Sequence, residues 1–240
     1  LAVFDGNAIV GTAHAHSVEL THPGGSSPSA LVDMVGVVPT HRRRGLLTQM
    51  MMCQLADFHQ RGESLAALTA SESVIYQRFG YGIGSLQEDW SIGREYSALT
   101  SLFQPDGYIR FVSGTEAKTS VLEVYHKVTS QRPGMVRYQP ESYDKFLYDS
   151  SHTTDDPPVF RVVYQGSDGP LGYARYQVNG DVLVVQELMA VTPASWAGLW
   201  HFCLSMDLMT GTEAVRRPVD DPLLWMLADP RRVKRDIKDR

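Results

Sequence analysis

Residues 31–52 read LVDMVGVVPTHRRRGLLTQMMM, and they decide the fold. The run from Leu31 to Val38 is mostly apolar and rich in β-branched valine, which predicts a buried strand. Pro39 cannot donate to a sheet ladder, so it should end that strand. Thr40 is the expected N-cap of the next element. The apolar spacing that follows predicts a helix over Leu46–Gln60.

The turn between strand and helix, His41–Gly45, carries three consecutive arginines. Backbone N–H groups in a first helical turn lack partners and carry partial positive charge, which suits a phosphate. Arginine adds forked donors, and Gly45 lets the backbone approach an anion without an intervening Cβ. The turn is not a Walker A loop, because no Gly-Lys-Ser/Thr follows, and it is not GxGxxG, because it holds one glycine.

A second apolar run, Leu65–Ala70, predicts the next strand of the same sheet. The helix before it is stopped by Arg61-Gly62. A strand, a helix and a strand of these lengths form a right-handed crossover with parallel neighbours. Ligands of such sheets bind beyond the carboxyl ends of the strands, here beside Val37 and Ser71.

Two earlier runs, Leu1–Phe4 and Ala8–Leu20, read as strands joined by a tight turn at Asp5-Gly6-Asn7. The fold class is therefore α/β with a mixed sheet. His14 and His16 lie on one face of the longer strand. A metal site there would need further ligands close in space, and the sequence indicates none, so we expect ordinary strand histidines and no metal.

Composition fits a globular protein: of 240 residues, 43% are hydrophobic and 20% charged. The net charge of −5 argues against a dedicated nucleic-acid binder. Cys53 and Cys203 lie in apolar helical stretches, which favours buried free thiols and a reducing, cytoplasmic compartment. No apolar run is long enough for a membrane span. Because the chain begins with Leu1, we expect it to be part of a longer reading frame, and secretion stays open.

A tyrosine-centred segment, Ser71–Gly82, follows the strand that begins at Leu65. Ser71 or Ser73 is expected to cap a short helix that ends at Gly80. Taken alone, the helical spacing of its aromatic residues favours core packing over catalysis.

These motifs together resemble the GCN5-related N-acetyltransferases (GNAT), whose pyrophosphate loop reads Arg/Gln-x-x-Gly-x-Gly/Ala after a Val-rich strand. Residues 42–47 match its first anchors, and Leu47 departs from the last small residue. Tyr76–Tyr81 resembles the Tyr-x-x-x-Gly-Phe/Tyr element of the same superfamily. The wording VVPTHRRRGLL is similar to the enhanced intracellular survival (Eis) family, in which the departure at Leu47 is usual.

The resemblance implies acetyl-CoA as co-substrate and no metal. Backbone of the Val-rich strand would pair with pantetheine amides as an added strand does. The residues implied to bind the coenzyme are Val35, Gly36, Val37, Arg43, Arg44, Gly45, Leu46, Leu47, Thr48, Ser71 and Glu72. Tyr76 is the implied catalytic general acid, because a phenol is protonated at neutral pH and can donate to the leaving thiolate. Tyr81 is expected to pack.

The general base stays unassigned. In the family the C-terminal carboxylate is thought to take the proton of the amine, and a last, sterol-carrier-like domain is expected to be absent from this chain, as are the helices before the first strand. Asp33 is the only carboxylate on the same face of the strand as Val35 and Val37. It is a candidate base, although a solvated carboxylate is the simpler interpretation. We therefore expect this chain to bind acetyl-CoA more readily than it turns it over.

A second unit is expected after a polar, turn-rich boundary at Ser97–Gly107, which gives a catalytic domain over 1–96 and a second domain over 97–240. Strands, a hairpin at Asn179-Gly180 and a helix after Thr192-Pro193 repeat the first architecture. The repeat lacks the arginine fork, so it reads as a degenerate GNAT-like domain with Trp196 and Trp200 packing. Helices are also expected over residues 116–128 and 140–150.

The expected function is acetyl transfer to a primary amine of a polycationic small molecule, aminoglycoside-like, or of a lysine side chain. A protein-lysine or N-terminal acetyltransferase is a related possibility. The alternative class is a non-catalytic coenzyme-A-binding or assembly module with a retained GNAT fold. No nucleic-acid partner is expected from one basic cluster. A homo-oligomer, a hexamer by the resemblance, is the expected assembly.

Overall fold

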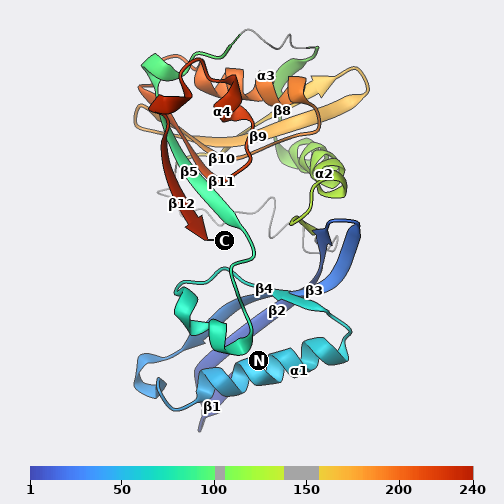
Figure 1. Cartoon of the computed structure of the whole chain (residues 1–240), viewed down its shortest axis with the longest axis vertical. Coiled ribbons are helices and arrows are strands. Elements are labelled where there is room, and N and C mark those ends of the chain that lie inside the picture. Colours follow the sequence, from blue (N-terminus) through green and yellow to red (C-terminus); the bar gives the residue numbers. More distant parts are fainter. Residues whose placement is uncertain (101–105, 138–156, 240) are drawn as a thin grey trace. The chain divides into compact units, whose positions relative to one another are not determined.

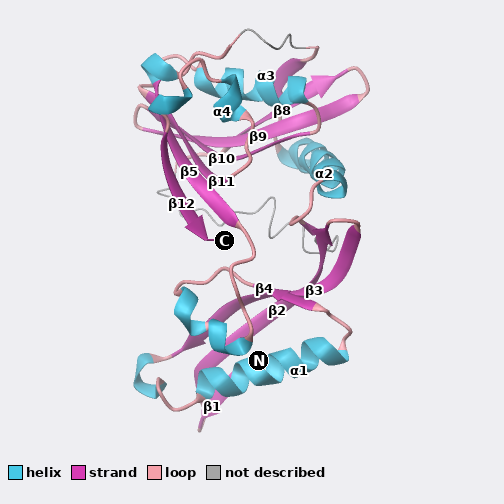
Figure 2. Ribbon diagram, viewed as in Figure 1, coloured by secondary structure: helices cyan, strands magenta, loops and turns pink. Residues whose placement is uncertain are grey.

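A computed structural model describes residues 1–100, 106–137 and 157–239. The described residues form two compact units, one made of 1–85 with 132–137, the other of 86–131 with 157–239. Each unit contains a sheet, so the α/β class with mixed sheets is confirmed (Figure 2). Within the described residues, no helix is both long and apolar enough to cross a bilayer.

The first sheet has the order β1-β2-β3-β4 (Figure 1). A short strand, β7, also pairs with β2. β1 to β3 are antiparallel, and β3 and β4 are parallel, as the crossover predicted. The strands are β1 (Ala2–Asp5), β2 (Ala8–His22), β3 (Gly25–Val37), β4 (Leu65–Ala67) and β7 (Val136–Arg137). β3 therefore begins earlier than the apolar run indicated, because Ser26 to Ser29 pair with the end of β2.

Helix α1 (Leu46–Gln60) has the predicted bounds and packs on one face of this sheet through Phe58, which meets Ala30 and Val32. Its C-terminal stop is also confirmed, because Gly62 adopts φ of 74° and the Glu63 N–H bonds the Phe58 carbonyl.

The prediction of Thr40 as N-cap was wrong. Thr40 lies in a separate 3₁₀ turn, η1 (Pro39–His41), and Gly45 is the N-cap of α1. The chain needs the left-handed φ of 80° at this position to enter the helix from the turn, which glycine adopts without strain.

A β-bulge interrupts β3. Thr12 pairs with Gly36 and His14 pairs with Asp33, so two residues of β3 face one of β2. Met34 takes the left-handed φ of 52° at this point. The bulge restores Val35 to the α1 side, where it packs with Val32 and Phe58. The expectation that Asp33 shares a face with Val35 was therefore wrong, because an extra residue breaks the two-residue alternation.

β4 is shorter than predicted, and the segment after it is not an α-helix. Two 3₁₀ turns, η2 (Ser73–Ile75) and η3 (Gln77–Phe79), follow instead. Gly80 ends the second turn with φ of 91°, so the predicted stop at this glycine is confirmed.

The second sheet has the order β12-β5-β11-β10-β9-β8-β6 (Figure 1). Its strands are β5 (Leu86–Gly93), β6 (Tyr108–Phe111), β8 (Phe160–Gly166), β9 (Gly169–Asn179), β10 (Val182–Ala190), β11 (Gly211–Pro218) and β12 (Lys234–Asp239). The sequence placed the strand at Leu86 at the close of the first domain. It pairs instead with β11 and β12, so this part of the prediction was wrong and the compact units divide before Leu86.

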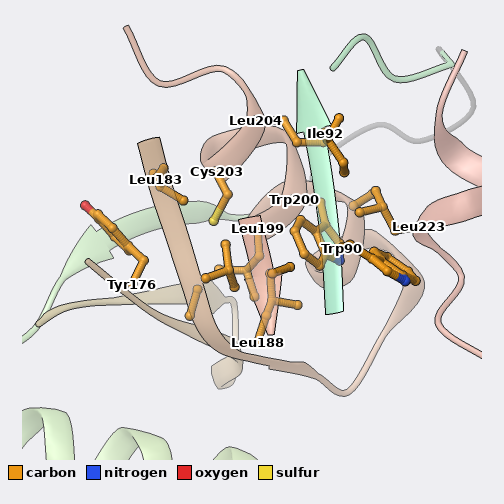
Figure 3. Packing of buried hydrophobic residues seen from close by; sticks show 14 of the residues in the cluster. Trp90, Ile92, Tyr176, Leu183, Leu188, Leu199, Trp200, Cys203, Leu204 and Leu223 are labelled. Atoms are coloured by element: carbon orange, nitrogen blue, oxygen red, sulfur yellow. The ribbon is translucent and has the colours of Figure 1, made fainter. Parts of the chain in front are cut away.

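Helices cover both faces of the second sheet: α2 (Gly114–Gln131) on one, α3 (Pro193–Leu204) and α4 (Leu223–Met226) on the other. Neighbouring residues show the alternation, since Tyr173 packs with α2 and Ala174 with α3. Trp200 of α3 is fully buried, and its ring lies 6.4 Å from that of Trp90 (Figure 3). Trp196 is partly buried and packs against the same core.

Helix α2 covers the predicted helix over residues 116–128. The predicted hairpin at Asn179-Gly180 joins β9 to β10, with Gly180 at φ of 63°. The helix predicted at Thr192-Pro193 is α3, which ends at Leu204. The predicted helix over 140–150 lies outside the described residues.

Glu88 supports the edge of the second sheet as a buried carboxylate, 1% exposed. It accepts hydrogen bonds from Trp90 Nε1 and from the guanidinium of Arg235 on β12. The Arg235 hydrogen bonds hold the pKa of Glu88 below its usual value, against the opposing effect of burial. The unfolded chain therefore binds this proton first as the pH falls.

Stability of the second unit should consequently decrease below about pH 4.5, the ordinary range of a glutamate, and be fully present above it. Glu88→Gln should flatten this acid-side slope, while Glu213→Gln, at an exposed position of β11, serves as the matched control. Urea unfolding at pH 7 and at steps down to pH 3 measures the slope. Equal slopes in wild type and Glu88→Gln would contradict the assignment.

Candidate active site

The turn after β3 presents an open helix N-terminus. After Val37 the chain makes the 3₁₀ turn η1, and Arg43 and Gly45 then take left-handed φ values of 63° and 80°. The first backbone hydrogen bond of α1 runs from the Gln49 N–H to the Gly45 carbonyl. Among the residues that the structure describes, no side chain caps the helix. The N–H groups of Leu46, Leu47 and Thr48 therefore stay available to an anion.

Side chains near the turn hold it in place. His41 Nε2 lies 3.0 Å from Asp5 Oδ2, and His41 Nδ1 lies 2.9 Å from the Thr40 hydroxyl. Arg42 donates from Nε to the Val37 carbonyl at 3.3 Å. Asp5 ends β1, so the turn is tied to the far edge of the same sheet.

Arg43 and Arg44 differ from Arg42. Both are exposed, and within the described residues neither makes a hydrogen bond or an ion pair. In the chain they come directly before Gly45, the N-cap of α1. Arginine side chains and unpaired N–H groups at a helix N-terminus are the kinds of donor that bind a phosphate or diphosphate.

Strands β3 and β4 stop pairing before β3 reaches this turn. Their parallel pairing ends at Leu31 and Ala67. In the part of the chain that the structure describes, the β4 side of Val35, Gly36 and Val37 therefore has no strand partner. An extended amide-containing ligand can complete such an edge by strand addition.

The other predicted coenzyme residues lie after β4. Ser71 and Glu72 are exposed and precede η2. The parallel pairing places the carboxyl ends of β3 and β4 at the same edge of the sheet, which brings this segment to the side of the α1 N-terminus.

Tyr76 stands between the two 3₁₀ turns as the residue before η3. Its ring is half-buried and lies 6.0 Å from that of Tyr81, edge to face. Burial raises the pKa of Tyr76 above its ordinary value, so the phenol keeps its proton at neutral pH. The Tyr81 hydroxyl is buried and has no hydrogen-bond partner among the described residues.

At the equivalent turn of the second unit, a side chain caps the helix N-terminus. Thr192 is the N-cap of α3, and its hydroxyl accepts the Ser195 N–H at 3.1 Å, in a capping box. The side chain of Ser195 also bonds the Leu171 carbonyl. The donors that would meet an anion are thus used inside the protein.

In the second unit, a side chain also occupies the gap where the two parallel strands stop pairing. β10 and β11 pair in parallel only as far as Val185 and Ala214. Beyond that point Arg217 of β11 donates to the Leu188 carbonyl of β10 at 3.2 Å and pairs with Asp221 at 2.7 Å. Among the described residues of the first unit, no side chain makes a comparable hydrogen bond across the gap between β3 and β4.

The structure also brings together a group that sequence reasoning missed. His14, His16 and Asp33 place their ligand atoms within 4.8 Å of one another. The His-x-His spacing was visible in the sequence, but the third member depends on the register and the bulge of β3.

Comparisons with known proteins agree with this geometry. Two models described as acetyltransferase (GNAT) domains match the chain, at residues 1–84 and 134–237. Among curated proteins, an uncharacterized N-acetyltransferase of Streptomyces avermitilis is 38% identical over 246 residues, which cover 97% of this chain and 59% of that protein. The N-acetyltransferase Eis of Mycobacterium tuberculosis is 32% identical over 239 residues, with 94% and 57% covered.

The fold comparison points the same way. The crystal structure of Eis1 from Mycobacterium abscessus has a TM-score of 0.84 and 31% identity, and the match covers all of this chain and 62% of Eis1. A GCN5-related N-acetyltransferase from Anabaena variabilis has a TM-score of 0.83 at 14% identity, which shows the fold alone. The chain spans about 59% of the length of the curated relatives it matches.

Proposed function

The chain belongs to the GNAT family of acetyltransferases and is similar to its Eis members, and from this premise we propose that it binds acetyl-CoA and transfers the acetyl group to a primary amine. One observation carries the proposal. An uncapped helix N-terminus, flanked by the uncommitted Arg43 and Arg44, lies at the carboxyl edge of two parting parallel strands.

In the proposed complex each part of the coenzyme meets a matching feature. The diphosphate accepts hydrogen bonds from N–H groups of residues 45–48 and from the two free arginines. The pantetheine amides pair with the open edge of Val35–Val37, and Ser71 and Glu72 flank the coenzyme from the neighbouring strand end. The thioester then lies near the bulge of β3, where backbone N–H groups can polarise the acetyl carbonyl.

For acetyl transfer, this chain offers a side chain that can donate a proton to the leaving group. The amine attacks the thioester carbon, the tetrahedral intermediate collapses, and the coenzyme leaves as a thiolate. Tyr76 gives its proton to that thiolate. The base that receives the amine proton stays unassigned, because the bulge turns Asp33 to the other face of β3.

The proposed acceptor is an amine of a polycationic small molecule, aminoglycoside-like, or a lysine side chain. The net charge of −5 supports cationic substrates, and so does the similarity to Eis. The second unit is proposed as a GNAT domain without coenzyme, because the N-cap of α3 and the gap between β10 and β11 are already occupied by its own side chains. A homo-oligomer in the cytoplasm is the proposed setting.

Coenzyme titration tests the proposed site. Arg43→Ala combined with Arg44→Ala should weaken acetyl-CoA binding at least tenfold, since a charge-assisted hydrogen bond contributes about 1.5–3 kcal/mol. Isothermal titration calorimetry on the 240-residue chain measures the affinity. The matched control is Arg231→Ala, an exposed arginine of the other unit.

The salt dependence gives a second readout of the same variants. Because the diphosphate is anionic, the wild-type affinity should fall as salt rises, and the double variant should lose most of that slope. Unchanged affinity and slope in the double variant, with the control also unchanged, would place the coenzyme elsewhere.

A further inference from the structure

The face of the first sheet away from α1 carries three side chains of metal-ligand type. Ala15 packs with the α1 core, so its neighbours His14 and His16 project from the opposite face of β2. Asp33 of β3 is the direct cross-strand partner of His14. The bulge at Met34 leaves Asp33 on the histidine side while Val35 returns to the core.

The three groups already converge. His14 Nδ1 lies 2.7 Å from Asp33 Oδ1, and His16 Nε2 lies 3.4 Å from Asp33 Oδ2. The two imidazole rings are 4.2 Å apart, edge to face. One ligand atom from each side chain therefore lies within 4.8 Å of the others, without any rearrangement of the backbone.

From this geometry we propose that His14, His16 and Asp33 form a binding site for a divalent transition-metal ion, with Zn²⁺ as the ion of choice. Two imidazoles and a carboxylate are a common donor set for Zn²⁺, whereas Mg²⁺ and Ca²⁺ prefer oxygen ligands. The site requires neither the coenzyme nor the acetyl-transfer chemistry.

Ligand spacing supports the choice of ion. With metal–ligand bonds of about 2.0–2.1 Å, ligand atoms of a tetrahedral Zn²⁺ site lie about 3.3 Å apart. His16 Nε2 lies 3.4 Å from Asp33 Oδ2, close to this distance. His14 Nδ1 lies 2.7 Å from the other oxygen, Asp33 Oδ1, so this contact must open by roughly 0.6 Å when an ion binds between the three side chains.

Access is also suitable. The His14 side chain is 46% exposed and that of Asp33 is 32% exposed, whereas His16 is 17% exposed. The ion can therefore enter from solvent, and a fourth coordination position stays open to water, as in sites with three protein ligands. An ion here links β2 to β3 across the bulge, so it should stabilise the first unit.

Metal titration tests the proposal directly. The chain carries Cys53→Ser, because the Cys53 thiol is exposed and not buried as the sequence predicted. It is stripped of metal with a chelator and then titrated with Zn²⁺ against a chromophoric chelator. We expect one Zn²⁺ bound per chain. His16→Ala and Asp33→Asn should each weaken binding at least tenfold, since even outer-shell changes cost 10–100-fold. His59→Ala, at an exposed position on α1, is the matched control and should bind as the background does.

Two further measurements separate a metal site from a hydrogen-bonded cluster. Zn²⁺ should raise the thermal midpoint of the background chain and of His59→Ala, but not that of the ligand variants. Bound Co²⁺ should show the strong visible absorption of a tetrahedral site only where all three ligands remain. Circular dichroism without metal checks that each variant is folded. Equal Zn²⁺ affinity in background and ligand variants, or no binding at all, would overturn the proposal, whatever the outcome for acetyl-CoA.

Discussion

Tyr76→Phe is expected to lower kcat for acetyl transfer by about 10²–10⁴-fold, the usual contribution of a general acid, with little change in the affinity for acetyl-CoA. The substitution removes one hydroxyl and keeps the ring. Burial raises the pKa of Tyr76, so the wild-type phenol remains a proton donor throughout the neutral range. In the proposed mechanism, loss of the phenol leaves the departing thiolate without its proton donor.

Thiol release from acetyl-CoA in the presence of kanamycin or a lysine-rich peptide measures kcat. Coenzyme titration of the same preparations measures affinity. Tyr81→Phe is the matched control, because its hydroxyl is buried, has no hydrogen-bond partner in the described chain, and lies one ring contact away. We expect kcat of this variant to stay within about threefold of wild type, well short of a lost general acid.

The pattern of outcomes distinguishes the alternatives. A selective loss of kcat in Tyr76→Phe identifies the donor. Equal activity of Tyr76→Phe and wild type would remove Tyr76 from the mechanism. Coenzyme binding without thiol release in any preparation would favour a coenzyme-binding or assembly module over an enzyme.

The sequence predicted correctly several helix boundaries, caps and strand pairings. Helix α1 has the bounds that its apolar spacing and the Gly62 stop indicated, and Thr192 caps α3 as its position before Pro193 implied. The parallel pairing of β3 with β4 followed from the length of the crossover. These features depend on residues that are close in the chain.

Features set by long-range pairing were not predictable in the same way. The bulge at Met34 has no signal in the apolar pattern, since any regular strand would place Asp33 with Val35. β5 joins the second sheet by pairing with β11 and β12. These partners come more than a hundred residues later in the chain, so the local pattern around β5 does not indicate them. The Asp33 cluster with His14 and His16 was missed for the same reason: it depends on register.

Arg217 has the largest expected effect on stability. The residue is 3% exposed, and its guanidinium donates from Nε and a terminal nitrogen to the carboxylate of Asp221, a residue that is 1% exposed. The guanidinium carbon also lies 5.5 Å and 5.3 Å from the ring centroids of Trp196 and Trp200. Nothing in the strand pattern revealed this role, because a lone arginine in a strand is more often exposed.

Arg217→Ala should lower the free energy of unfolding of the second unit by about 3–5 kcal/mol. The substitution leaves the Asp221 carboxylate buried without its cation, although one oxygen keeps the Leu223 N–H. It also removes a donor from the Leu188 carbonyl and leaves a cavity against two tryptophans. Urea unfolding followed by tryptophan fluorescence measures the loss. Arg216→Ala, the exposed neighbour, should change stability by less than about 0.5 kcal/mol.

A double variant decides why the ion pair is present. Replacing a buried pair with apolar residues of similar volume is often neutral or stabilising, so Arg217→Met with Asp221→Leu should recover most of the stability lost in Arg217→Ala. Recovery without a gain of coenzyme binding would mean that the pair serves as packing between β10 and β11. If Arg217→Ala instead kept its stability and lost acetyl-CoA affinity, the second unit would be a ligand site, and its assignment as a domain without coenzyme would be wrong.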